Sequence, residues 1–154
     1  MERKAHAPRA VAPEETVRQR EGLSIRIARI QGQDDRDPRD VEERSFQFAV
    51  AVVQLLALLP ANAPRHVVDR VAGLSTDIGA DVAEAFNCHS KRTHLSRLES
   101  ARRASRELGY WLRLIIGAEL ASPETIRPFL DEAHALHTMM TALCSAARQE
   151  TESG

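Results

Sequence analysis

The segment RHVVDRVAGLSTDIGADVAEAF, residues 65–86, sets the fold class of this 154-residue chain. Its apolar residues recur at the i, i+3 and i+4 spacing of one helix face; they are Val67, Val71, Leu74, Ile78, Val82 and Ala85. The segment therefore predicts a helix with one buried face. Residues 87–89 are predicted to form a short loop, and Ser90 is a natural N-cap for the next helix.

Two more helices are predicted on the C-terminal side. Residues 91–119 have an apolar face made of Leu98, Ala101, Leu108, Leu112, Ile115 and Ile116. The last helix begins near Ser122 or Thr125, because Pro123 suits a first helical position after a serine cap. Pro128 lies deep in such a helix, so we expect a kinked first turn or a regular helix that begins at Thr125. The apolar stripe of this helix is Phe129, Ala133, Leu136, Met140 and Leu143.

A helix is also predicted on the N-terminal side, over residues 40–59, with acidic residues in its first turn and Pro60 as its stop. Its apolar residues cover nearly the whole circumference, whereas a bundle helix needs one apolar stripe. Another subunit is the expected cover, so we predict a homo-oligomer whose interface includes Phe46, Val50 and Val53. The alternative is that the segment before residue 39 folds back over this helix.

Residues 1–38 differ in composition from the rest and are predicted to form a mobile or partly ordered N-terminal arm. They contain prolines, glycines and both signs of charge, with few large apolar residues. Within them Leu23, Ile25 and Ile27 alternate with smaller or polar residues, which is the period of a short edge strand or a partner-docking peptide. The predicted domains are the arm at 1–38, a four-helix bundle at 39–150 and a tail at 151–154.

Composition agrees with an all-α protein of one domain. Hydrophobic residues make up 43% of the chain but aromatic residues only 4%, which favours an aliphatic helical core. Four helices with short connections predict an antiparallel up-down-up-down four-helix bundle. Two lone cysteines, no apolar leader and no run of roughly 20 apolar residues predict a cytoplasmic protein that has no membrane partner.

The charge is distributed unevenly along a chain whose formal net charge is −1. That total excludes a generally basic protein that coats nucleic acid. Residues 91–113 are nevertheless strongly basic, and helical geometry places a basic stripe opposite the apolar face. Arginine with an interleaved tyrosine binds phosphates and stacks a base, so the candidate nucleic-acid-binding residues are Lys91, Arg92, Arg103, Arg106, Tyr110 and Arg113. The alternative is a solvated outer face, salt-bridged to the acidic neighbouring helices.

Catalytic and metal-binding patterns are weak. Bundle helices that hold a di-metal centre need paired Glu-x-x-His motifs, whereas the last helix offers only His134 and His137 near Asp131. Cys88 and His89 are adjacent, and adjacent residues rarely orient each other as a catalytic dyad. We therefore expect no metal, no cofactor and no enzymatic activity.

Several motifs carry a family resemblance. Residues 77–85, DIGADVAEA, resemble the "S-I-G-A-N-x-x-E-A" signature of bacterial four-helix-bundle proteins related to the 23S ribosomal RNA intervening-sequence protein. Ser90-Lys91, Ala101, Arg106-Glu107 and residues 110–114, YWLRL, are similar to that family's "S-K-x-x-F … A … R-E-T-x-Y-W-L-R-L", and residues 130–136, LDEAHAL, to its closing "L-x-x-E-A-x-E-L". This chain departs from the pattern at Asp77, Asp81, His94 and Leu108, and in its longer arm.

The resemblance implies a small antiparallel bundle that assembles as a ring, commonly a pentamer, without known catalytic residues. A related branch, the accessory protein of diversity-generating retroelements, binds nucleic acid and a reverse transcriptase. We therefore expect a non-enzymatic homopentamer that is associated with RNA or a nucleic-acid enzyme, or serves as a scaffold. The alternative is a protein-interaction module that docks a partner through the arm or the ring surface and has no nucleic-acid role.

Overall fold

Five helices make up the regular structure of the computed structural model, which describes residues 12–33 and 37–153. They are α1 (Pro13–Gln31), α2 (Asp40–Leu56), α3 (Arg65–Asn87), α4 (Lys91–Gly117) and α5 (Pro123–Glu152). No strand occurs in these two ranges. The all-α prediction is confirmed, but the described residues form five helices where four were predicted, because residues 13–31 are helical.

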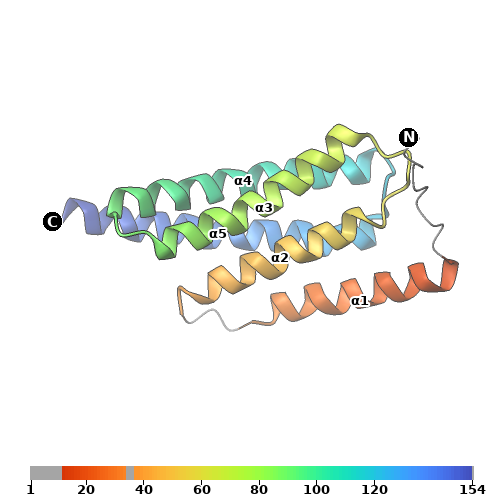
Figure 1. Ribbon diagram of the computed structural model, residues 1–154, viewed down its shortest axis with the longest axis horizontal. Helices are drawn as coiled ribbons and strands as arrows, with labels where there is room; N and C mark the ends of the chain where they lie inside the picture. The colour runs from red at the N-terminus through yellow and green to blue at the C-terminus, as the bar shows by residue number, and fades with distance from the viewer. Residues whose placement is uncertain (1–11, 34–36, 154) are drawn as a thin grey trace, which may run out of the picture.

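The helices lie along one long axis, and successive helices run in alternating directions (Figure 1). Each of α2, α3 and α4 packs against the helix that follows it, and α5 also contacts α2. Because α2 has no contact with α4, these two helices lie across the bundle from each other. The main core is aliphatic apart from a tilted pair of phenylalanine rings, Phe48 and Phe129, whose centroids are 6.3 Å apart.

Helix α1 corrects the sequence prediction for the N-terminal segment. Leu23, Ile27 and Ile30 are buried at the helical spacing of four and three residues, whereas Ile25 is 61% exposed. The alternating, strand-like interpretation is therefore wrong. The three buried side chains join the main core, and α1 packs on α2 and α5 (Figure 1), so it covers one side of α2. The arm prediction for residues 1–11 and 34–36 lies outside the described residues.

The helix caps were predicted well. The Ser90 hydroxyl accepts a hydrogen bond from the Thr93 amide at 3.3 Å, and the Ser122 hydroxyl accepts one from the Thr125 amide at the same distance. Helix α5 begins at Pro123 and continues through Pro128, so of the two predicted starts the one after the Ser122 cap is confirmed and the one at Thr125 is wrong. It also runs to Glu152, into the segment that was predicted to be a tail.

Two helix ends differ from the prediction for local reasons. After Leu56, the amides of Leu58 and Leu59 bond to carbonyls only three residues back, which tightens the chain before Pro60 and ends α2 early. Helix α4 ends at Gly117 because Glu119 adopts a left-handed conformation, with φ of 56°. The Leu120 amide then donates to the Ile115 carbonyl at 3.0 Å, which closes a Schellman-type cap.

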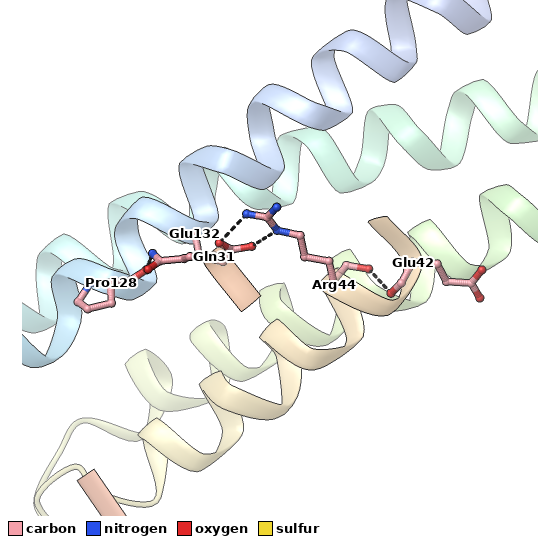
Figure 2. Close-up of polar contacts among 6 residues, drawn as sticks. Gln31, Glu42, Arg44, Pro128 and Glu132 are labelled. Carbon is pink, nitrogen blue, oxygen red and sulfur yellow. Dashed lines mark hydrogen bonds and ion pairs between the residues drawn. The ribbon is translucent and has the colours of Figure 1, made fainter. Parts of the chain in front are cut away.

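A buried ion pair joins α2 to α5. Arg44 donates to both carboxylate oxygens of Glu132, from Nε at 2.6 Å and from Nη2 at 3.0 Å (Figure 2). Arg44 is 4% exposed and Glu132 is fully buried. The amide of Gln31 donates to the Pro128 carbonyl at 3.1 Å, so the end of α1 is tied to α5 one turn away from the pair.

The packing of α1 predicts a local effect of the Ile27→Asp substitution. Burial of the isoleucine side chain contributes about 1.5–3 kcal/mol, and the substitution replaces it with a buried carboxylate. We therefore expect α1 to be released from α2 and α5. Limited trypsin digestion is expected to cut the variant at Arg26 or Arg29 faster than the parent, while α2–α5 stay intact. Ile25→Asp is the matched control, because that side chain is exposed. Equal resistance of the two variants would contradict this packing.

Candidate nucleic-acid interface and apolar groove

The outer face of α4 carries the six residues that the sequence selected for nucleic-acid binding. The opposite face of the helix is buried in the core through Leu98, Leu108, Leu112 and Ile115. Because side chains on the two faces point in opposite directions, the six polar residues lie on the exposed side: Lys91, Arg92, Arg103, Arg106, Tyr110 and Arg113. Their predicted exposure is confirmed.

These six residues fall into two groups along the helix. Arg103, Arg106, Tyr110 and Arg113 follow one another at intervals of three or four residues, which makes neighbours about 5–6 Å apart at Cβ; we call them the α4 stripe. Lys91 and Arg92 lie about 16–18 Å from Arg103 along the helix, at ~1.5 Å of rise per residue. The Lys91 ammonium donates to the Glu150 carbonyl of α5 at 3.4 Å, so it contributes to helix packing.

The α4 residues that form ion pairs are not residues of the α4 stripe. Arg70 of α3 donates from Nε to Glu107 at 2.9 Å, and Arg148 of α5 donates to Glu99 at 2.5 Å. Arg97 bonds to Asp81 of α3 at 3.0 Å. Among the described residues no ion pair includes Arg103, Arg106 or Arg113. The two glutamates of α4 are thus neutralised by cations from neighbouring helices, and its outer arginines are left for solvent or a ligand.

The electrostatics of the two glutamates follow from these contacts. The hydrogen bond from Arg148, supported by the charges of Arg103 and Arg102, lowers the pKa of Glu99. The hydrogen bonds from Arg70 and then Trp111 lower the pKa of Glu107. Both carboxylates are therefore ionised at neutral pH. The stability that these pairs contribute is present above the ordinary glutamate pKa and is lost as the pH falls through the lowered values.

An apolar groove of ≈ 510 Å³ lies between α2 and α3. The predicted interface residues Phe46, Val50 and Val53 line its α2 side, with Phe46 56% and Val53 51% exposed. Gly79, Ala80 and Ala83 line its α3 side. A Cβ at Gly79 would lie 3.6 Å from the Ser45 carbonyl oxygen, an ordinary van der Waals contact, so α2 and α3 lie close together here.

The α3 side of the groove was not foreseen from the sequence. The residues that form it are small and exposed or half-buried, and the sequence predicted them only as part of a helix with one buried face. Their signal is a run of small side chains next to the buried Ile78 and Val82, on the side of α3 that faces α2. The groove lies on the side of α2 that α1 leaves open, since the groove lining contains no residue of α1.

The metal-binding and cysteine patterns of the sequence do not form a site among the described residues. No group of three or more His, Cys, Asp or Glu side chains in the described ranges is arranged to hold a metal ion. The Cys88 thiol donates to the Ala85 carbonyl at 3.3 Å, and burial raises the pKa of the Cys144 thiol. None of the helices at residues 12–33 and 37–153 has the length and apolar character needed to cross a membrane.

The fold defines a small all-α bundle protein with two exposed surfaces, one basic and one apolar. The chain belongs to the 23S rRNA-intervening sequence protein family, whose model matches residues 39–142. The match spans α2, α3, α4 and most of α5, and α1 lies outside it. The resemblance read from the sequence is therefore confirmed.

A solved structure shares the fold. It is a protein of unknown function from the S23 ribosomal protein family of Bacteroides thetaiotaomicron, with a TM-score of 0.63 and 24% sequence identity. The similarity covers 68% of this chain and 97% of that one. No protein of curated function matches the chain significantly.

Proposed function

We propose that this protein is a non-enzymatic homo-oligomer of the cytoplasm that binds RNA through the α4 stripe. In each subunit α2–α5 form an up-down-up-down four-helix bundle. One observation carries the proposal. Arg103, Arg106 and Arg113 are exposed, and the ion pairs among the described residues are formed by other arginines.

Phosphate recognition suits this arrangement physically. Helix α4 has seven Lys and Arg residues against two Glu, and both of those carboxylates are already paired. Guanidinium groups match phosphate oxygens with two parallel hydrogen bonds and remain charged at any physiological pH. Arginines spaced along one exposed face release counterions from a polyanion as they bind, so affinity is expected to fall steeply with salt.

Assembly through the groove would leave the stripe accessible. Because α2 and α4 lie across the bundle from each other, a second copy seated in the α2–α3 groove would not cover α4. Each added subunit would then present one more stripe, and linked stripes bind a single strand with higher avidity than one stripe. A pentamer is the assembly that the family resemblance implies.

The Arg103→Ala/Arg106→Ala variant tests the RNA proposal. Removing two phosphate contacts is expected to weaken RNA binding and to reduce the slope of log K against log salt by about 1.4, at ~0.7 per contact with a single strand. The measurement is fluorescence anisotropy titration at several salt concentrations.

The matched control is Arg18→Ala/Arg20→Ala, which removes the same charge from exposed positions on α1, a helix that does not contact α4. The control is expected to keep the parental slope. If the stripe variant also keeps the parental affinity and slope, the stripe is not the RNA site.

A second candidate function is protein interaction through α1. This helix lies outside the family match and exposes Val17 and Ile25 on its outer surface. The two side chains lie about 12 Å apart along the helix axis, and exposed apolar surface is a feature of interaction sites. The stripe variant separates the two functions, since a module that acts through α1 keeps its protein partner when Arg103 and Arg106 are removed.

A further inference from the structure

A group of aromatic and charged side chains from α3 and α4 surrounds the C-terminal half of the α4 stripe. Trp111 is its centre. Its ring meets the Tyr110 ring edge to face at 5.5 Å between centroids and 87° between planes. On α3 the ring of His66 meets Trp111 in a second edge-to-face contact at 6.5 Å. The indole Nε1 of Trp111 donates to Glu107 Oε1 at 3.2 Å.

Glu107 ties this group to the neighbouring helix. Its Oε1 atom accepts hydrogen bonds from Trp111 and from both Nε and Nη2 of Arg70. One carboxylate oxygen thus fixes the indole on α4 and the guanidinium on α3. Trp111 is half-buried and is held on three sides, so it forms a rigid support beside Tyr110. Ordering an aromatic ring before the ligand arrives reduces the entropy lost on binding.

Tyr110 is the exposed member of the group. It is 60% exposed, whereas tyrosine is intermediate in burial on average. Arg106 lies one turn before it and Arg113 about one turn after it, both exposed on the same face. A flat ring between two guanidinium groups offers a stacking surface with a phosphate donor on each side.

Unpaired nucleotides are the ligand that fits this combination. A base presents its flat face to a protein side chain only when it is free from the stack of a duplex. A duplex offers phosphates to the arginines but no base face to Tyr110. The arginines alone would not distinguish the two forms, whereas the tyrosine would.

We infer that the Tyr110–Trp111 platform makes the α4 stripe selective for single-stranded over double-stranded nucleic acid, with an unpaired base stacked on Tyr110 and its flanking phosphates on Arg106 and Arg113. This inference rests on the proposed RNA-binding function and specifies its substrate. Base stacking tolerates sequence changes, so the selectivity is for unpaired structure and not for a base sequence.

The test compares a short oligouridine, the DNA oligonucleotide of matching length and an RNA duplex of the same length, titrated against parent, Tyr110→Ala and Tyr110→Phe. The parent is expected to bind the two single strands about tenfold or more tighter than the duplex, which is the stacking contribution of one base expressed as a ratio of affinities. Tyr110→Ala should lose most of this preference and keep its duplex affinity. Tyr110→Phe, which retains the stacking face, should keep the preference.

Tryptophan fluorescence gives a second readout that a purely structural role of Tyr110 would not change. Trp111 is the only tryptophan of the chain. A base on Tyr110 lies next to it, so oligouridine should change the Trp111 emission while the duplex should not. The DNA arm shows whether the ribose hydroxyl contributes: equal binding of both single strands assigns the selectivity to stacking and phosphate alone.

Several results would overturn the inference. They are an unchanged single-strand preference in Tyr110→Ala, an equal loss of single-strand and duplex binding in that variant, or a Tyr110→Phe variant that behaves as Tyr110→Ala. If Tyr110→Ala leaves the single-strand preference unchanged while Arg103→Ala/Arg106→Ala still weakens RNA binding, this inference is rejected and the proposed function stands. Full RNA binding by the Arg103→Ala/Arg106→Ala variant rejects the proposed function itself.

Discussion

Replacing Arg44 by Ala is expected to lower the free energy of unfolding by about 3–5 kcal/mol. The substitution leaves the Glu132 carboxylate fully buried after the removal of the guanidinium that donates two hydrogen bonds to it. Removing one partner of a buried pair costs much more than the pair contributes, because the remaining charge keeps its desolvation penalty. This is a large fraction of the 5–15 kcal/mol that holds a typical domain together.

Urea denaturation followed by circular dichroism measures this loss at a fixed protein concentration, since assembly couples stability to concentration. Arg44→Met/Glu132→Leu is the companion variant, and it should recover most of the loss because it removes both charges together. Arg65→Ala is the surface control: its i,i+4 pair with Asp69 is exposed, and its loss should cost less than about 0.5 kcal/mol. A cost for Arg44→Ala as small as that of the control would contradict a structural role for the buried pair.

The buried pair was missed in the sequence although both residues occupy core positions. Glu132 lies three residues after Phe129 and four before Leu136, and Arg44 lies four residues before Phe48. A charged residue on an apolar stripe signals a buried partner. The two residues are 88 positions apart, and only the packing of α2 on α5 brings them together, so no local pattern pairs them.

Helices α3, α4 and α5 were predictable because their apolar residues repeat over about four to five turns. Helix α1 was not, because it is short of apolar residues and three of them happen to alternate. Ile25, the residue that completes the alternation, is exposed, while Ile30 supplies the third buried position of the helical period. In a segment of 19 residues one misplaced isoleucine is enough to change the apparent period.

The candidate surfaces were predictable to the extent that a single helix defines them. The α4 stripe lies on one helix, so helical geometry alone gave its exposure. Its lack of ion pairs depends on Arg70 and Arg148, which pair with the α4 glutamates from other helices. The groove lies between two helices, and only its α2 side was predicted from the sequence. The α1 helix covers another side of α2, and the groove is the side that remains for the proposed second subunit.

The Phe46→Asp/Val53→Asp variant is expected to dissociate the proposed oligomer into single chains that remain folded. Both side chains are more than half exposed in one subunit, so the substitutions cost a single chain little. In an assembly that buries the groove, each subunit would lose the burial of two apolar side chains, about 1.5–3 kcal/mol apiece, and would also bury two carboxylates. These losses repeat at every interface of a ring.

Sedimentation velocity and light scattering measure the mass, and circular dichroism checks that the helices persist. Val17→Asp/Ile25→Asp is the matched control, since it places the same charges at equally exposed apolar positions on α1. It should keep the mass of the parent. An unchanged mass for the groove variant, or an equal loss for both variants, would show that the α2–α3 groove is not the subunit interface.

The same variant separates assembly from RNA binding. Because the α4 stripe is intact and lies across the bundle from α2, a single chain should still bind oligouridine with strong salt dependence. What it should lose is avidity for a strand long enough to reach several stripes, so its affinity should no longer rise with strand length. If length dependence survives in the monomer, neighbouring stripes on one assembly do not act together, and the ring serves a role other than multivalent RNA binding.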